Sequence, residues 1–534
     1  MVAWGYIARR RAEIALRRLL GGAVGGKPTF NRPIIPATIR NQDWLQPVPA
    51  REALSGLVRV VDKRSVQGDS MRKKVAVAAF LLIAIAVSPN ATWAQIQPTL
   101  RLSKAVGPPT TKLKVSGQGF TPNADVSIGF DSAVLARTRT DDSGTFSRVS
   151  LRVPQSATPG NHRVSGFDPA GLSGVATFLV QTEWPQFHFS PLHSGYNPYE
   201  FTLSPATVSG LNLSWSASAS ACASPVVAGG SVYFPVQTSL QAVDANSGTP
   251  LWTYSTGTTV CTTPAVSGGM VFFGGIDGGV NPPGHVYALK ASSGTLLWSF
   301  PTSRGIFFSS LTVVNGVVYA VSNDGTVYAL KASTGTLLWN YATGEDASSP
   351  AVANGIVYVA GNRVYALSAK TGAVLWSNLL GTNVWDGSNP VLANGAVYFG
   401  TVGSVYALDA INGSTLWTYP AGFVASTPAV TKGAVYVGSL TNNTLYALNS
   451  KTGAPIWTNL FSGDFLSASP SVANGVVYVG ASDHYFYALD ANNGSVLWSY
   501  DTGGNTGDCL TCSPAVVEGA VYVITASDTV WAFR

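Results

Sequence analysis

The element Val286-Tyr-Ala-Leu-Lys-Ala-Ser-Ser-Gly-Thr-Leu-Leu-Trp298 decides the fold, because it returns along the C-terminal two-thirds of the chain. Further copies occupy 327–339, 364–376, 405–417, 445–457 and 486–498, and a looser copy occupies 240–252. The period is near 40 residues. Self-similarity at such a fixed period is the signature of a repeat architecture, in which each unit buries its faces only by stacking on its neighbours.

A second element, Ser/Thr-Pro-x-Val followed by Gly and Val-Tyr, alternates with the first. Its starting pairs are Ser224-Pro225, Thr263-Pro264, Ser349-Pro350, Asn389-Pro390, Thr427-Pro428, Ser469-Pro470 and Ser513-Pro514, and an eighth copy, Ser310-Leu311, lacks the Pro. Pro suits the first residue of a strand, since it has no N–H to donate. Each unit therefore predicts four antiparallel strands: a Pro-led strand, Val-Tyr, Val-Tyr-Ala-Leu and Leu-Leu-Trp. Such units repeated around a ring make a β-propeller.

The two ends of the repeat region predict how the ring closes. The last unit, from Ser513 to Arg534, lacks its fourth strand, whereas 211–215 is a Trp-bearing strand without the rest of its unit. We expect the early strand to complete the last unit. The predicted fold is all-β, an eight-bladed β-propeller of four-stranded blades over 211–534, with a lead-in segment at 182–210. The repeated Trp residues are expected to pack between blades.

Residues 97–181 read as a separate all-β module. Strands are expected around 113–116, 126–130 and 149–153, with turns at 141–144 and 159–161. This spacing of short strands is typical of a β-sandwich. His162 is expected to be an exposed strand residue.

The N-terminus carries a targeting pattern that starts inside the chain. Residues 71–74 are basic, 75–87 are uncharged and nearly all apolar, and a small-residue segment ends at Ala94. This order predicts a signal peptide at 71–94 with cleavage near Ala94; the alternative is a membrane anchor, although thirteen apolar residues are short for a bilayer. Residues 1–70 are interpreted as a mis-called start, and the alternative is a genuine basic extension.

Charge is concentrated in the same N-terminal stretch. Residues 1–74 hold 15 Lys/Arg and 5 Asp/Glu, whereas the remainder holds 17 and 21. The formal net charge of +6 therefore says little about the main body. Because a nucleic-acid footprint needs clustered basic residues, we expect no nucleic-acid partner. With 11% charged residues, the chain is also not a coiled coil or a charged disordered protein.

The repeat resembles the pyrroloquinoline-quinone (PQQ) repeat, through its Ala-x-Asp/Asn-x-x-x-Gly-x-x-x-Trp pattern. The likeness covers about 211–534 and extends to quinoprotein alcohol dehydrogenases and to the propeller lipoprotein of the outer-membrane barrel-assembly machinery. The opening Trp184-Pro-Gln-Phe-His188, with 193–198, resembles secreted PQQ-like propellers. The module at 97–181 resembles bacterial immunoglobulin-like modules of the IPT/TIG kind, through Gly117-x-Gly-Phe-x-Pro122. The PQQ repeat implies a fold, and many of its members bind no quinone.

A quinoprotein dehydrogenase would need a carboxylate base, oxygen ligands for Ca²⁺ and cations for the quinone. The family's adjacent Cys pair is missing, and the best acid pair, Glu345-Asp346, is interpreted as a solvated loop. Asp244, Asp409 and Asp490 share one repeat position and are interpreted as turn caps. His188 and His193 are five residues apart outside any helix and are not assigned to a metal. No catalytic, cofactor-binding or metal residue is therefore predicted.

Four cysteines form the remaining constellation. Cys222, Cys261, Cys509 and Cys512 all precede Pro-led strands in the first, second and eighth units, which are neighbours in a closed ring. In an oxidising compartment we expect the disulfides Cys222–Cys261 and Cys509–Cys512. The alternative is a Cys₄ zinc site.

The sequence therefore favours a secreted or periplasmic, non-catalytic binding or scaffold propeller. Its expected partner is a protein or a cell-envelope polymer bound through a propeller face, and no stable membrane anchor is expected in the mature chain. No cofactor is expected. The alternatives are a PQQ-dependent dehydrogenase, which would bind PQQ with calcium, and an outer-membrane protein assembly factor.

Overall fold

The computed structural model describes residues 97–278, 282–307, 309–344, 348–380, 388–463, 466–503 and 512–534. These residues are almost entirely β-strand and turn, with one short 3-10 helix, η1 (Val208–Gly210). No helix in these ranges is long and apolar enough to cross a bilayer. The signal peptide, its membrane-anchor alternative and the two interpretations of 1–70 all concern sequence outside the described residues.

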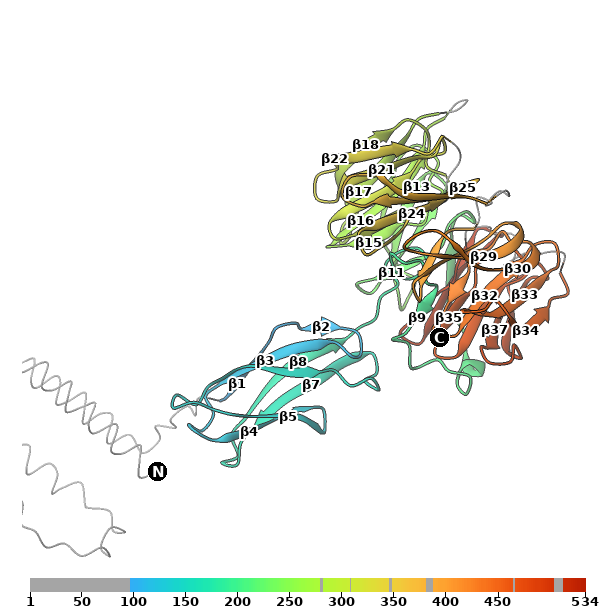
Figure 1. The fold of residues 1–534 in the computed structure, drawn as a ribbon. Coiled ribbons are helices and arrows are strands. Elements are labelled where there is room, and N and C mark those ends of the chain that lie inside the picture. The colour runs from blue at the N-terminus through green and yellow to red at the C-terminus, as the bar shows by residue number, and fades with distance from the viewer. Residues whose placement is uncertain are drawn as a thin grey trace, which may run out of the picture. The chain divides into compact units, whose positions relative to one another are not determined.

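The N-terminal module consists of two sheets, drawn in blue to cyan in Figure 1. One sheet has the order β1 (Thr99–Leu102), β3 (Lys112–Gln118), β6 (Phe146–Arg152). The other has the order β2 (Val106–Gly107), β8 (Ser173–Val180), β7 (Gly160–Phe167), β4 (Asp125–Phe130), β5 (Ala133–Arg139). Alternate residues of these strands form one core, in which Val115, Ile128 and Phe178 are fully buried. The relation of this N-terminal module to immunoglobulin-like modules stays a prediction.

The expectation that His162 is exposed is wrong. Its side chain is only 12% exposed, because its ring bonds on both sides: Nδ1 lies 2.7 Å from Asp131 Oδ2 and Nε2 lies 2.7 Å from Thr158 O. Burial acts to lower the pKa of His162, but these hydrogen bonds outweigh it and raise the pKa above its usual value.

Among the described residues, eight sheets built from antiparallel strands follow. Seven are meanders in chain order, and the last takes one strand from earlier in the chain. Figure 1 shows their colours running from green to red. The first four contain β11 (Val226–Ala228), β12 (Ser231–Val236), β13 (Ser239–Asp244) and β14 (Pro250–Ser255); β15 (Ala265–Ser267), β16 (Met270–Ile276), β17 (Gly284–Lys290) and β18 (Leu296–Thr302); β19 (Thr312–Val314), β20 (Val317–Val321), β21 (Thr326–Lys331) and β22 (Leu337–Ala342); and β23 (Ala351–Ala353), β24 (Ile356–Ala360), β25 (Arg363–Ser368) and β26 (Val374–Leu379).

The next three contain β27 (Val391–Ala393), β28 (Ala396–Gly400), β29 (Val402–Asp409) and β30 (Thr415–Phe423); β31 (Ala429–Val430), β32 (Ala434–Ser439), β33 (Thr444–Asn449) and β34 (Pro455–Leu460); and β35 (Ser471–Ala473), β36 (Val476–Gly480), β37 (Tyr485–Asp490) and β38 (Val496–Asp501). The short strand β9 (Tyr196–Asn197) joins the last of these, parallel to β35. The final sheet holds β39 (Ala515–Val517), β40 (Ala520–Thr525), β41 (Thr529–Phe533) and the early strand β10 (Leu213–Ser218).

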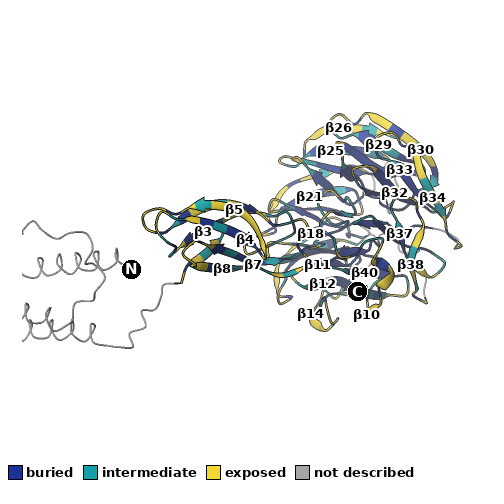
Figure 2. Cartoon of the chain, turned by 90° about the horizontal axis from the view of Figure 1, so that it is seen from below, coloured by how far each residue is buried: buried dark blue, intermediate teal, exposed yellow. Residues whose placement is uncertain are grey.

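These sheets close into a ring. The first strands of successive sheets contact one another in order from β11 to β39, and β39 in turn contacts β11. Strand β10 completes the final sheet as its fourth strand, with Trp215 opposite Ala532 and Ala217 opposite Val530. The predicted all-β propeller and its closure by an N-terminal strand are therefore confirmed. Figure 2 shows inner strands such as β11 and β40 buried, whereas β14 carries exposed residues.

The side chain of the repeated Trp contacts the next blade. Every indole Nε1 donates to a backbone carbonyl in the following sheet or, for the last, beside β10: Trp215 to Ala245 (3.1 Å), Trp252 to Ala291 (2.9 Å), Trp298 to Ala332 (2.9 Å), Trp339 to Ala369 (2.9 Å), Trp376 to Ala410 (3.2 Å), Trp417 to Ser450 (3.1 Å), Trp457 to Ala491 (3.0 Å) and Trp498 to Leu211 (3.1 Å). Seven of these indole rings, all but that of Trp498, also lie over the turn glycine of the next blade, so the Trp residues pack between blades as predicted.

Candidate functional site

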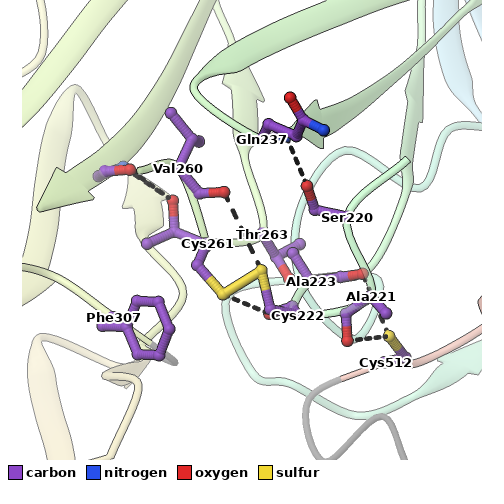
Figure 3. Close-up of a disulfide and its surroundings, with 12 residues drawn as sticks. Ser220, Ala221, Cys222, Ala223, Gln237, Val260, Cys261, Thr263, Phe307 and Cys512 are labelled. Carbon is purple, nitrogen blue, oxygen red and sulfur yellow. Dashed lines mark hydrogen bonds between the residues drawn. A yellow bond between two sulfur atoms is a disulfide. The ribbon is translucent and has the colours of Figure 1, made fainter. Parts of the chain in front are cut away.

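The predicted disulfide Cys222–Cys261 is confirmed. The two residues precede β11 and β15, their Cα atoms are 5.3 Å apart, and Figure 3 shows the bond between their sulfur atoms. Equivalent positions on neighbouring blades lie close together near the ring axis, which allows the bridge. We call this end of the ring the Cys end. Because these two sulfurs are bonded to each other, they supply no thiolates to the alternative Cys₄ zinc site.

Cys512 lies at the same end, beside the first blade. Its Sγ is 3.3 Å from Ala223 O and 3.8 Å from Ala221 O (Figure 3). The ring thus brings the eighth blade next to the first, as the cysteine pattern required. Cys512 is disulfide-bonded. Its expected partner, Cys509, lies outside the described residues, so that pairing stays a prediction.

A ring of polar side chains lies just inside the Cys end, at the residue before each Pro-led strand. We call it the girdle: Ser224, Thr263, Ser310, Ser349, Asn389, Thr427, Ser469 and Ser513, each no more than 2% exposed. Several backbone N–H groups of the girdle donate to the side chain of the next member: Ser224 to Thr263 (2.9 Å), Ser310 to Ser349 (2.8 Å), Ser349 to Asn389 (2.8 Å), Asn389 to Thr427 (3.1 Å), Thr427 to Ser469 (2.9 Å) and Ser513 to Ser224 (2.8 Å). The Ser/Thr of the Ser/Thr-Pro motif therefore links blades.

The lead-in segment places buried side chains at the axis. Phe187, His188 and His193 are 0% exposed. Phe187 stacks on His188 with ring centroids 4.7 Å apart and meets His193 edge-on at 5.3 Å. His188 Nδ1 lies 3.1 Å from His193 O, and His193 Nε2 lies 2.9 Å from Thr312 Oγ1 on β19.

Burial holds both histidines neutral. It lowers the pKa of His188 to about 3, and burial together with the neighbouring His188 lowers the pKa of His193 to about 3. The described residues contain no cluster of three or more His, Cys, Asp or Glu that could hold a metal ion. The structure thus brings the two histidines together as neutral packing groups.

The repeat-position carboxylates lie at the opposite end of the ring, which we call the turn end. Asp244 Oδ1 accepts from the N–H groups of Asn246 (3.0 Å) and Ser247 (2.9 Å). Asp409 and Asp490 accept in the same way from the residues that follow them. These contacts are those of the turn caps expected from the sequence. The acid pair Glu345-Asp346 lies outside the described residues.

These residues do not fit PQQ with calcium. The ion would need several oxygen ligands, commonly carboxylates, and the quinone carboxylates would need cations. The described groups at the axis are instead neutral. The girdle side chains accept hydrogen bonds from neighbouring blades, and the histidines are uncharged. The carboxylates Asp244, Asp409 and Asp490 are engaged in turns at the rim.

Sequence reasoning missed two parts of this site. The Pro of this motif predicts a strand start, but no role was predicted for the Ser, Thr or Asn before it. Such a polar residue recurs once per unit, and this recurrence was the signal for a ring. The opening Trp184–His188 was noticed only as a resemblance. Its place at the axis follows from the fully buried Phe187 and His193, which a single unrepeated segment does not reveal.

The comparisons with known proteins agree with this architecture. A family model described as "Outer membrane protein assembly factor BamB", of the PQQ_2 repeat type, matches residues 206–282, 282–423 and 401–534. The search of curated proteins found no match.

Solved structures with the same fold include a BamB and two dehydrogenases. BamB from Moraxella catarrhalis is 19% identical with a TM-score of 0.51, covering 61% of this chain and 97% of its own. The quinohemoprotein alcohol dehydrogenase ADHIIG from Pseudomonas putida HK5 is 16% identical with a TM-score of 0.56, covering 66% and 80%. A europium-containing methanol dehydrogenase is 14% identical with a TM-score of 0.53, covering 64% and 89%. At these identities the likeness shows the fold alone, and it is the family match over more than half of the chain that places this protein in the PQQ_2 family of BamB-type propellers.

Proposed function

We propose that the protein is a secreted or periplasmic, non-catalytic binding or scaffold propeller for a protein or a cell-surface polymer. The observation that carries the proposal is the presence of buried lead-in residues at the axis. Phe187, His188 and His193 lie there as buried neutral groups, and the girdle is bonded from blade to blade. Such an axis supports a rigid ring whose outer surfaces do the binding.

Family membership supports a protein partner. The family is named for an outer membrane protein assembly factor, and one solved structure of the same fold is a BamB. We therefore rank a protein above a cell-envelope polymer as the partner. Assistance in outer-membrane protein assembly is the more specific form of this proposal.

The second candidate is a PQQ-dependent dehydrogenase, which the fold of the two alcohol dehydrogenases favours. If PQQ were bound, it would supply the oxidising group. The described residues at the axis offer it neither carboxylate ligands for calcium nor cations, so we derive no catalytic step through it.

Location and domain boundaries complete the proposal. The Cys222–Cys261 disulfide and the family both fit a place outside the cytoplasm. We propose a signal peptide at 71–94, an immunoglobulin-like module at 97–181, a lead-in segment at 182–210 and the propeller at 211–534.

Crosslinking in cells that export the protein, followed by affinity capture from envelope extracts, tests the proposal. We expect one envelope component to be enriched reproducibly. Two charge-reversal variants identify the binding face. Arg304, at the Cys end, is changed in Arg304→Glu, and Lys370, at the turn end, is changed in Lys370→Glu. Loss of capture in one variant and retention in the other would show which end binds the partner. Equal recovery from a sham capture, together with dye-linked oxidation of an alcohol or sugar by the purified chain, would overturn the proposal in favour of the enzyme.

A further inference from the structure

One segment of the chain contacts every blade of the ring. We call Trp184–Asn197 the strap. It meets the innermost strand of each sheet in chain order, at the second residue after the Pro or its equivalent: Val227 N to Trp184 O (2.8 Å), Val266 N to Pro185 O (2.7 Å), Val313 N to Gln186 Oε1 (3.0 Å), Val352 N to Pro191 O (2.7 Å), Leu392 N to Leu192 O (2.8 Å), Val430 N to Ser194 O (2.8 Å), Val472 N to Gly195 O (2.7 Å), and Asn197 Nδ2 to Val516 O (2.8 Å).

Most of these bonds use the strap's backbone. The innermost strands of a propeller have a free edge facing the axis, where unpaired N–H groups would cost roughly 1–3 kcal/mol each if buried without a partner. The strap supplies acceptors to seven such N–H groups, and six of these acceptors form adjacent pairs in its sequence at 184–185, 191–192 and 194–195. It therefore does for the ring what a bound peptide does for the edge of a sheet.

The strap also lies at one end of the axis. In each innermost strand the girdle residue comes first and the residue bonded to the strap comes three positions later, as for Ser349 and Val352. At about 3.3 Å per strand residue, the two levels are ~10 Å apart along the axis. The girdle is at the Cys end, so the strap is at the turn end.

Residues in the middle of the strap also contact the sheets around the axis. His193 reaches Thr312 in the third sheet, while a Cβ at Gly195 would lie 2.9 Å from Ala429 of the sixth sheet and 2.8 Å from His188 Nδ1. The middle of the strap thus contacts blades that are far apart around the ring. Gly195 has φ +59°, so both its backbone conformation and the tight space favour glycine.

We propose that the turn end of the propeller axis is a peptide-binding site whose occupant is this chain's own strap, and that the bound strap closes this end of the axis. The site recognises an extended segment mainly through the backbone carbonyl groups of that segment. The side chains of Gln186 and Asn197 add further hydrogen bonds. A ligand or partner that uses the axis must then approach from the Cys end. This last consequence rests on the proposed function, whereas occupancy by the strap does not.

Cleavage of the full chain tests occupancy without any partner. A site for a sequence-specific protease is inserted between Ala206 and Thr207, which are both exposed and follow the strap. After complete cleavage, we expect the N-terminal fragment to co-elute with the propeller on size exclusion in native buffer. Separation of the fragments, with the propeller's Trp fluorescence unchanged, would overturn the proposal.

Matched variants show whether the strap itself holds the fragments together. Gly195→Val should release the N-terminal fragment after cleavage. Gly171→Val, in the same fragment, also has positive φ but no atom within 4 Å of the added Cβ, and it should not. Retention by both variants would mean that residues outside the strap carry the association.

Hydrogen exchange keeps the proposal falsifiable if Gly195→Val fails to fold. In the uncut wild-type chain, the amides of Val352, Leu392 and Val430 should exchange at least ~10-fold more slowly than after denaturant-assisted release of the cleaved fragment. Equal exchange in the two states would contradict the strap's role.

Discussion

At the scale of single residues, the ring depends on a repeated contact between a Trp and the turn glycine of the next blade. Gly335 has φ +70°, and a Cβ there would lie 2.6 Å from Trp298 Cε3. The sequence showed both residues at fixed spacing, so their importance was predictable. That they meet across blades was not, because the contact joins different copies of the repeat.

Replacing this glycine should destabilise the propeller more than its backbone strain alone explains. Gly335→Ala incurs about 1–2 kcal/mol for positive φ and a further ~1–3 kcal/mol for displacing the ring. Gly316→Ala is the control, since it has φ +77° but no atom within 4 Å of the added Cβ. Urea unfolding followed by Trp fluorescence measures both, and equal midpoints would show that the ring contact does not matter.

The buried histidines predict acid sensitivity. His188 and His193 have a pKa of about 3 in the fold and about 6.5 when unfolded, so below pH 6.5 the unfolded chain binds protons that the native chain does not. Stability should therefore fall as the pH drops from about 6.5 towards 3.

Thermal unfolding between pH 8 and pH 4 checks this dependence. Trp fluorescence reports the propeller, because 97–181 contains no Trp. His193→Gln should flatten the acid slope, although it lowers stability at neutral pH by loss of packing. His162→Gln, in the N-terminal module, should leave the slope of the propeller unchanged. An unchanged slope in His193→Gln would refute the assignment.

At the scale of elements, the four-stranded unit and its order were predictable, because Pro, Gly and Trp mark strand starts, turns and the outer strand in most copies. The missing fourth strand after Phe533 also pointed to β10. The strap was not predictable, since its bonds are made largely by backbone carbonyls, which leave no residue signature. The described side-chain hydrogen bonds to the blades come from Gln186, His193 and Asn197, and none of these residues recurs in a pattern.

The disulfide joins the first two blades beside the point where β10 closes the ring. It links residues 39 apart, which in the loop-entropy model contributes on the order of 3–4 kcal/mol. The double variant Cys222→Ala/Cys261→Ala should therefore unfold at a markedly lower urea concentration than the wild type. Non-reducing peptide mapping of the exported wild-type protein should recover the 222–261 pair, and finding these thiols free would contradict the assignment.

At the scale of the whole molecule, the chain runs from an N-terminal targeting region through the module at 97–181 to the closed ring. We interpret residues 71–94 of the targeting region as a signal peptide. Export should remove it near Ala94. Intact-mass and N-terminal sequence analysis of exported protein should therefore place the mature start close to Gln95. A start at Met1 or Met71 in the exported form would contradict this interpretation.

We propose that this propeller is a binding scaffold whose axis is closed at the turn end by its own strap. The most direct measurement is a titration of the purified chain with PQQ and Ca²⁺, followed by absorbance and by dye-linked oxidation of alcohols and sugars. We expect no saturable quinone band and no turnover, because neutral buried groups such as Phe187 and His193 occupy the axis. Stoichiometric binding of the quinone with sustained turnover would contradict the account.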